Sequence, residues 1–152
     1  MAGPSLFRPS DLSTDLIAYW KFDSDGTDEQ GNYDLTPVNT PAYTTEDYWR
    51  TGEDSCDLVA ASTQHYTSAR DTDLDLLDRW SIALWMKPDD VTSVSILSKG
   101  FTGSKGYALY LDSGKNLDVI MGGTQQASSP QDFLLNKWVH VVAQYDQTNS
   151  TP

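Results

Sequence analysis

Alternating apolar and polar residues dominate the second half of the chain and indicate β-strands. The pattern predicts five strands, at residues 81–87, 94–99, 107–111, 117–121 and 138–145. Residues 81–87 are apolar on both faces, so this strand is expected in the centre of a sheet with both faces covered. Residues 113–116 predict a hairpin turn between the third and fourth strands. Residues 122–130 are polar and are expected to form a loop.

One further strand is expected near the start of the chain. Residues 16–22 alternate, which places Leu16, Ala18, Trp20 and Phe22 on its buried face. Before it, residues 1–13 contain two prolines and little periodicity, which predicts an extended arm that precedes one folded domain over residues 14–152. Large aromatic side chains in or beside predicted strands are assigned to the core: Trp20, Trp80, Trp85 and Trp138.

The patterns between these regions are weak. Prolines and glycines interrupt residues 23–52, which are expected to be mainly loop. Short strands are expected around residues 33–38, 56–60 and 64–68, the last two joined by a turn of small residues. Residues 71–77 are compatible with a short helical turn.

Composition supports an all-β fold. Of the 22 acidic residues, 19 are Asp and only three are Glu. Asp favours turns and loops, whereas Glu favours helix interiors. Short strands separated by turns rich in Gly, Asp and Asn therefore predict an antiparallel β-sandwich of jelly-roll type. A chain of 152 residues is long enough to bury a substantial core.

Net charge excludes several classes of partner. The formal charge is −12, which disfavours binding to nucleic acid and to anionic lipid, because both need clustered Lys and Arg. No apolar run has the length of a membrane helix, and the first residues do not resemble a secretion signal. The single cysteine, Cys56, excludes an intrachain disulfide and is interpreted as a small buried residue.

No catalytic residues are expected. A retaining glycosidase needs two carboxyl groups about 5–5.5 Å apart, but Glu29, Glu46 and Glu53 all fall in loop-like regions and no predicted strand carries paired acids. His65 and His140 have no Ser or Cys partner at a suggestive spacing. The sequence thus predicts a protein that is not an enzyme.

Residues 23–29 form an acidic loop that is a candidate calcium site. Asp23, Asp25 and Asp28 lie close together around a glycine, and oxygen ligands on a flexible loop suit Ca²⁺. The loop lacks the bidentate Glu of an EF-hand, so that motif is not assigned. A solvated acidic turn is an equally weighted alternative.

Aromatic residues outside the main strands are candidate ligand-binding residues. Tyr43, Tyr48, Trp49 and Tyr66 lie in predicted loops or at strand ends, where an aromatic ring can stack on a sugar. The alternative is that they cover a loop-rich flank of the sandwich.

Five segments resemble a laminin-G-like domain of the concanavalin-A-like jelly-roll superfamily: residues 16–23, 31–36, 74–88, 96–112 and 137–146. The resemblance implies a jelly roll and, in many relatives, calcium bridging loops. Residues 58–60 are Leu-Val-Ala where the family usually has a Phe-Asp-Gly turn. The family pattern also continues beyond the strand at 138–145, so the chain is expected to be a fragment of a longer protein. The alternatives are that a neighbouring molecule supplies the missing strands or that the sandwich lacks them.

These observations give three functional hypotheses. The leading one is a recognition or adhesion module that binds a glycan or protein surface through its loop rims, assisted by calcium. The second is a structural or decoration subunit of a virion or another surface assembly, with the N-terminal arm of residues 1–13 joining copies. The third, a glycoside hydrolase, would need a site assembled from several loops. Either of the first two predicts an extracellular, virion or cell-surface location.

Overall fold

The computed structural model describes residues 15–45, 54–69, 71–76, 78–90, 93–100, 106–129 and 135–147. The chain divides into two compact units, Met1–Asp71 (unit 1) and Thr72–Pro152 (unit 2), which are described separately below. The expected arm at residues 1–13 lies outside the described residues. The described part of the chain contains no helix of the length and apolarity needed to cross a membrane.

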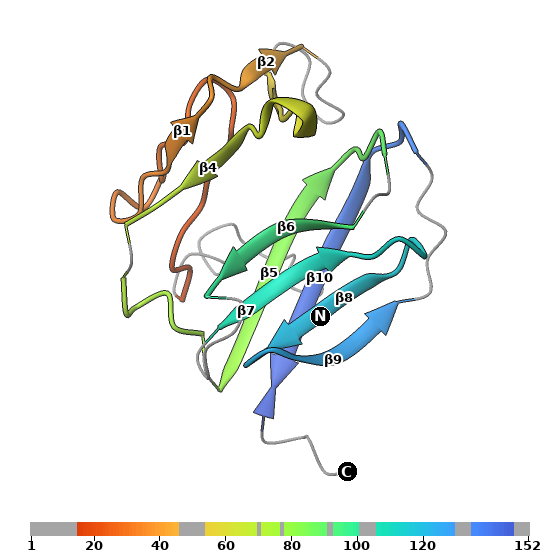
Figure 1. Ribbon diagram of the computed structural model, residues 1–152. Helices are drawn as coiled ribbons and strands as arrows, with labels where there is room; N and C mark the ends of the chain where they lie inside the picture. The colour runs from red at the N-terminus through yellow and green to blue at the C-terminus, as the bar shows by residue number, and fades with distance from the viewer. Residues whose placement is uncertain are drawn as a thin grey trace, which may run out of the picture. The chain divides into compact units, whose positions relative to one another are not determined.

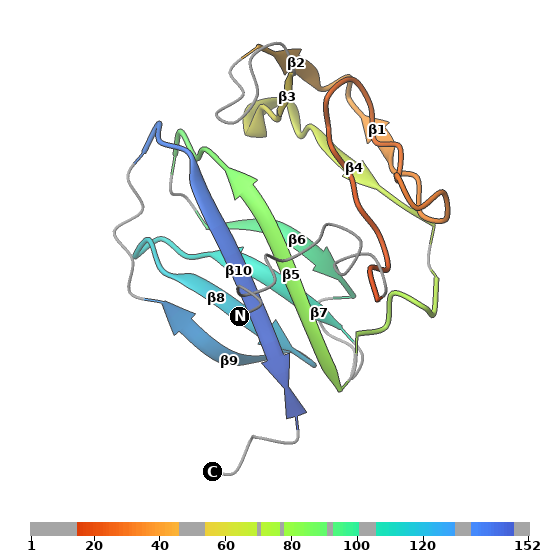
Figure 2. The same ribbon diagram turned by 180° about the vertical axis from the view of Figure 1, so that it is seen from behind.

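Unit 2 is an antiparallel two-layer structure. Its strands are β5 (Arg79–Met86), β6 (Val94–Lys99), β7 (Tyr107–Leu111), β8 (Leu117–Met121), β9 (Thr124–Ser129) and β10 (Val139–Asp146). One sheet has the order β6-β7-β8-β9, and β5 pairs with β10 in the other. Figures 1 and 2, which view the ribbon from opposite sides, show β5 and β10 lying across the four-stranded layer.

The core of unit 2 lies between these two sheets. Trp80 and Ala143, from β5 and β10, cluster with Tyr107, Leu109 and Met121 from β7 and β8. The Leu109 side chain is 0% exposed, and full burial of one such side chain stabilises a fold by about 1.5–3 kcal/mol. The all-β, antiparallel β-sandwich prediction is therefore confirmed.

Two predictions for unit 2 were wrong. Residues 122–130 were expected to form a loop, but they contain β9, which pairs with β8. Gly122 and Gly123 have φ of 57° and 79°, and positive φ at both central residues is what a tight hairpin turn requires. The residues of β9 are mostly Gln, Ala and Ser, whose weak β-propensity conceals the strand.

The second error concerns β5. Among the described strands it pairs only with β10, and Trp85 is 37% exposed rather than buried in the core. Residues alternate strictly along β5, so Trp80 points inward while Ala83 and Trp85 point outward. Apolar residues on both faces therefore did not indicate a central strand.

Unit 1 is built from short elements. These are β1 (Thr36–Val38), β2 (Ala42–Thr44), β3 (Ser55–Asp57), the 3₁₀-helix η2 (Ala60–Ser62) and β4 (His65–Thr67). β1 pairs with β4, and β2 pairs with β3. The three short strands predicted here are present in shortened form, but the segments at 56–60 and 64–68 do not pair with each other, and β2 was not predicted.

Residues 16–22 do not form the expected strand. Ala18, Trp20 and Phe22 are half-buried in alternation, as predicted, but Leu16 is 41% exposed. The only β-type pairing in this described segment is an isolated bridge between Trp20 and Asp28. Phe22 has a φ of 59°, which interrupts an extended chain. Residues 71–76 contain a short turn, as expected, in which the Asp75 amide donates to the Thr72 carbonyl at 2.9 Å.

Candidate functional site

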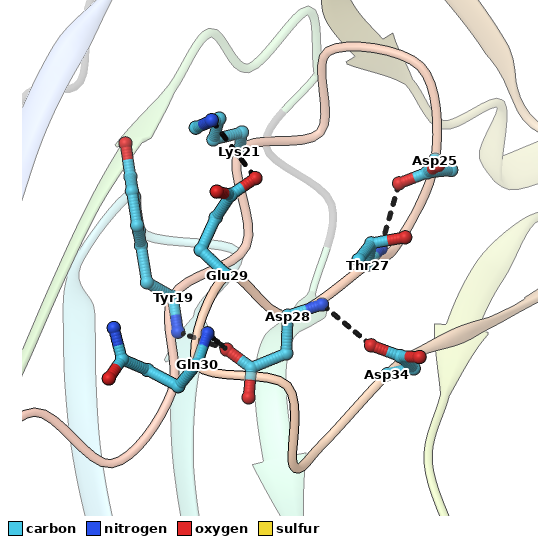
Figure 3. A network of polar contacts seen from close by, with 8 residues as sticks. All are labelled: Tyr19, Lys21, Asp25, Thr27, Asp28, Glu29, Gln30 and Asp34. Atoms are coloured by element: carbon cyan, nitrogen blue, oxygen red, sulfur yellow. Dashed lines mark hydrogen bonds and ion pairs between the residues drawn. The ribbon is translucent and has the colours of Figure 1, made fainter.

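The acidic loop of unit 1 is organised around the carboxylate of Asp28. This residue is 2% exposed. Its Oδ1 accepts the backbone N–H groups of Tyr19 at 2.8 Å and Gln30 at 3.0 Å, and its Oδ2 accepts those of Asn32 and Tyr33 at 3.1 Å each. In Figure 3, dashed lines join the Asp28 carboxylate to the backbone nitrogens of Tyr19 and Gln30. A single carboxylate thus satisfies four buried or half-buried backbone donors.

These hydrogen bonds determine the charge state of Asp28. Burial opposes ionisation, but the backbone donors from Tyr19, Gln30, Asn32 and Tyr33 outweigh it and hold the pKa of the carboxyl below its usual value. Asp28 is therefore a carboxylate at neutral pH. Its negative charge stabilises the loop because every donor lies on the main chain.

The remainder of the loop is fixed by similar local contacts. The Asp28 amide donates to Oδ1 of Asp34 at 2.8 Å, and the Thr27 amide donates to Oδ1 of Asp25 at 2.9 Å. The bonds from Thr27 hold the pKa of Asp25 below its usual value. Gly26 is required because a Cβ atom at this position would lie 2.5 Å from the Leu35 carbonyl oxygen.

A hollow of ≈ 210 Å³ opens on this loop. Six of its lining residues are polar or charged, and the seventh is aromatic: Lys21, Phe22, Asp23, Ser24, Asp25, Thr27 and Glu29. Nζ of Lys21 lies 2.9 Å from Oε1 of Glu29 (Figure 3), and this bond raises the pKa of Lys21. The hollow can offer carboxylate acceptors, an ammonium donor and a phenyl ring to a ligand that carries hydroxyl groups.

The predicted aromatic ligand residues divide into two groups. Tyr43 of β2 and Tyr66 of β4 lie together, and their hydroxyl groups hydrogen-bond to each other. The Phe22 ring meets the Tyr66 ring edge-on, with ring centroids 5.0 Å apart. Tyr48 and Trp49 lie outside the described residues. Tyr43 and Tyr66 are both half-buried, and Tyr66 links the Tyr43 hydroxyl group to the Phe22 ring of the acidic loop.

Cys56 belongs to this aromatic cluster. It is half-buried in β3, next to the hydroxyl group of Tyr66, and burial raises the pKa of its thiol. Burial likewise raises the pKa of Tyr66. The interpretation of Cys56 as an apolar core residue was therefore incomplete, because its thiol takes part in a polar contact.

Two of the three predicted calcium ligands, Asp25 and Asp28, accept hydrogen bonds from the main chain. Within the described ranges, no group of three or more His, Cys, Asp or Glu side chains could hold a metal ion. Calcium binds about six to eight oxygen atoms, but both oxygens of Asp28 accept backbone N–H groups and Oδ1 of Asp25 accepts the Thr27 amide. The assignment of Asp23, Asp25 and Asp28 as calcium ligands stays a prediction.

Neither histidine is among the residues of the loop network described above. Nδ1 of His65 lies 2.9 Å from the Thr63 carbonyl oxygen. In unit 2, the ring of His140 lies against that of Trp85, with centroids 4.8 Å apart. Of the other acidic residues considered for catalysis, Glu46 and Glu53 lie outside the described residues.

Unit 2 contains a half-buried ion pair that the sequence analysis missed. Nζ of Lys99, on β6, lies 2.5 Å from Oδ1 of Asp75, with side-chain exposures of 18% and 7%. Burial, together with the negative charge of Asp75, raises the pKa of Tyr107. The alternation of residues along β6 places Lys99 on the same face as Leu97, which packs against the core, and this could have been noticed in the sequence. In the structure, Lys99 pairs with the buried Tyr107.

A family model described as the concanavalin A-like lectin/glucanases superfamily matches residues 61–151, which is more than half of the chain. No curated protein and no solved structure matches the chain. Laminin-G-like domains of this kind generally bind carbohydrates or proteins, are generally non-catalytic although the superfamily includes glycosidases, and are typically extracellular.

Proposed function

Because the chain belongs to the concanavalin A-like lectin/glucanases superfamily, we propose that it is a non-catalytic recognition module that binds glycans through the acidic loop of unit 1. The observation that carries this proposal is the hollow on that loop, whose lining combines one aromatic ring with acceptor and donor groups. Sugar rings are recognised in this way, by an apolar contact with one face and by hydrogen bonds to the hydroxyl groups.

The order of the loop supports binding. Asp28 fixes the main chain from Tyr19 to Tyr33 through its four hydrogen bonds. The hollow is therefore formed before a ligand arrives, which lowers the entropic cost of association. Lys21 and Glu29 can exchange their mutual bond for bonds to sugar hydroxyl groups, because both side chains are substantially exposed, at 36% and 42%.

The electrostatics of the loop support recognition rather than hydrolysis. A glycosidase acid needs a raised pKa so that it holds a proton near neutral pH. In this loop, hydrogen bonds hold the pKa values of Asp25 and Asp28 below their usual range. Both residues are therefore acceptors at neutral pH and cannot protonate a leaving group.

The N-terminal arm was one of three features that favoured the virion or assembly hypothesis, together with the lack of a secretion signal and the single cysteine. Residues 1–13 lie outside the described residues, so no described contact supports an assembly role or a homo-oligomer formed through that arm.

An immobilised panel of neutral, amino-bearing and sulfated glycans tests the proposal. The full chain should bind at least one neutral or amino-bearing glycan, and Lys21→Gln and Phe22→Leu should each weaken that binding about three- to tenfold. Asp57→Asn, an exposed acid on β3, is the matched control and should bind like the wild type. Glycan binding that none of the loop variants alters would show that the hollow is not the site.

A second readout tests the absence of catalysis. The bound glycan, incubated with the full chain, should release no reducing ends above a blank. Sustained release that depends on protein concentration would identify a hydrolase and overturn the non-catalytic assignment.

A further inference from the structure

The outward face of the β5–β10 sheet carries an exposed aromatic pair. Trp85 and His140 are direct partners across the two strands. Their ring centroids lie 4.8 Å apart, with 31° between the ring planes. Trp85 is 37% exposed, and His140 is also exposed. The two rings therefore present adjacent aromatic surface to solvent at one position of the β5–β10 sheet.

The face continues from this pair with small, apolar and uncharged polar groups. The next outward pair is Ala83 with Val142, which is 54% exposed. The pair after it is Ser81 with Gln144, where the Gln144 amide nitrogen donates to the Ser81 hydroxyl at 3.2 Å. At about 3.3 Å per residue, the row from the aromatic pair to this polar pair extends over about 13 Å. An aromatic surface at one end and amide and hydroxyl groups at the other suit a short oligosaccharide.

The charge and the size of the outer β5–β10 face favour a small, neutral ligand over an anion or a protein. The three outward pairs from residue 85 to residue 81 contain no Lys or Arg, so they offer neither of these cationic side chains to a sulfate or carboxylate group. The whole face has eight outward-facing residues, whereas a stable protein interface needs roughly 20–30 residues on each side. A second copy of the chain would also bring a further net charge of −12, which opposes close association.

We infer that Trp85 and His140 form a stacking platform for a neutral saccharide, making the outer face of the β5–β10 sheet a glycan-binding site in unit 2. The inference rests on the proposed function for the class of ligand, but its site lies in the other unit and shares no residue with the acidic loop. Sugar rings stack on aromatic side chains because their C–H groups meet the negative π-face.

Affinity electrophoresis of the full chain through gels containing soluble neutral polysaccharides tests the inference. The probes are a β-1,3-glucan, a β-1,4-xylan and a galactomannan, with heparin as the anionic comparison. At least one neutral probe should retard the wild type, and Trp85→Ala should weaken the interaction roughly tenfold. Trp85→Phe, which keeps an aromatic ring, should stay within about threefold of the wild type.

Two controls separate the platform from folding and from the acidic loop. Leu58→Ala removes an exposed apolar side chain (50% exposed) from unit 1 and should not change retardation. Far-ultraviolet circular dichroism should give the same spectrum and melting curve for Trp85→Ala as for the wild type. If Trp85→Ala is unfolded, the comparison between Trp85→Phe and a Trp85→Leu variant decides, with Leu expected to lose binding.

The outcomes distinguish the two sites. Retardation that Trp85→Ala abolishes and Lys21→Gln leaves unchanged supports the platform and removes the loop as the site of that glycan. The reverse result supports the loop and overturns the platform, and the absence of retardation by every neutral probe overturns the platform as well. A Trp85-dependent dimer in sedimentation velocity would assign the face to a second copy and would also overturn the inference.

Discussion

Unit 1 and unit 2 are ordered by different means. In unit 2, strands of five to eight residues bury a shared apolar core, with Leu109 and Leu111 almost completely inaccessible. In unit 1, the described strands have three residues each, and the side chain of Asp28 organises the acidic loop by accepting hydrogen bonds from the main chain. Order thus comes from hydrophobic burial in one unit and from charge-assisted hydrogen bonds in the other.

Charge follows the same division. Unit 1 contains 13 acidic and 4 basic residues, whereas unit 2 contains 9 and 6. Most of the net charge of −12 therefore belongs to unit 1, whose short strands contain few apolar residues. The stability of unit 1 is therefore expected to depend on pH, because ionised side chains hold its loop. The stability of unit 2 is expected to depend on the volume of its buried side chains.

The largest expected effect comes from the core of unit 2. Leu109→Ala should lower the free energy of unfolding by about 3–5 kcal/mol, because it removes a fully buried side chain and leaves a cavity. Urea denaturation measures the change. Val142→Ala, on the exposed face of β10, is the control and should stay within about 0.5 kcal/mol of the wild type. A loss below about 1 kcal/mol for Leu109→Ala would contradict the two-layer core.

The next effect concerns the ion pair of unit 2. Lys99→Met should destabilise the protein by about 2–3 kcal/mol, because it leaves the Asp75 carboxylate half-buried without its cation. Adding Asp75→Leu should recover most of that loss, because an apolar pair replaces the buried charges. A double-mutant cycle in urea measures the coupling, and a coupling energy near zero would show that the pair contributes nothing.

A smaller loss is expected when the centre of the acidic loop is altered. Asp28→Asn keeps the size of the side chain but leaves one acceptor oxygen for four backbone donors, which should cost about 2 kcal/mol. Hydrogen exchange should accelerate at the amides of Tyr19, Gln30, Asn32 and Tyr33 and stay slow in β7. Equal acceleration in β7 would contradict the separation of the two units, and Asp57→Asn serves as the charge-matched control.

A still smaller effect is expected in the pH dependence of the unfolding free energy that Asp28 contributes. The pKa of Asp28 is lower in the folded chain than the unfolded value of about 3.9. Its stabilising contribution is therefore complete above that unfolded value and is lost as the pH falls through the folded pKa. The difference in unfolding free energy between the wild type and Asp28→Asn should be constant between about pH 5 and 7 and shrink below about pH 4. A difference that grows on acidification would contradict the ionised state of Asp28.

Much of unit 2 could be predicted from the sequence, because its strands alternate and bury one face. The bounds of β6, β7 and β8 coincide with the predicted segments. β9 escaped detection because its residues lack apolar alternation, although the preceding Gly122-Gly123 pair is itself a hairpin signal. The exposure of Trp85 could not be read from a strand that is apolar on both sides.

The acidic loop was harder to predict for a physical reason. The spacing of Asp23, Asp25 and Asp28 suggested metal ligands, yet the partners of Asp28 are main-chain amides as far as nine residues away. Every residue has such an amide, so residue types cannot reveal which ones converge. The pairing of Tyr43 with Tyr66 likewise depends on which short strands are neighbours.

The chain has a single thiol, and its position in the fold makes it a natural reporter of local opening in unit 1. Cys56 lies against the Tyr66 hydroxyl with a raised pKa, so it should resist alkylation while the Tyr43–Tyr66 contact is closed and react once that contact opens. The rate of maleimide labelling would then report local opening of unit 1 on the timescale of the reagent, without an introduced probe. Labelling as fast as that of a free thiol peptide would mean that the aromatic cluster is open most of the time.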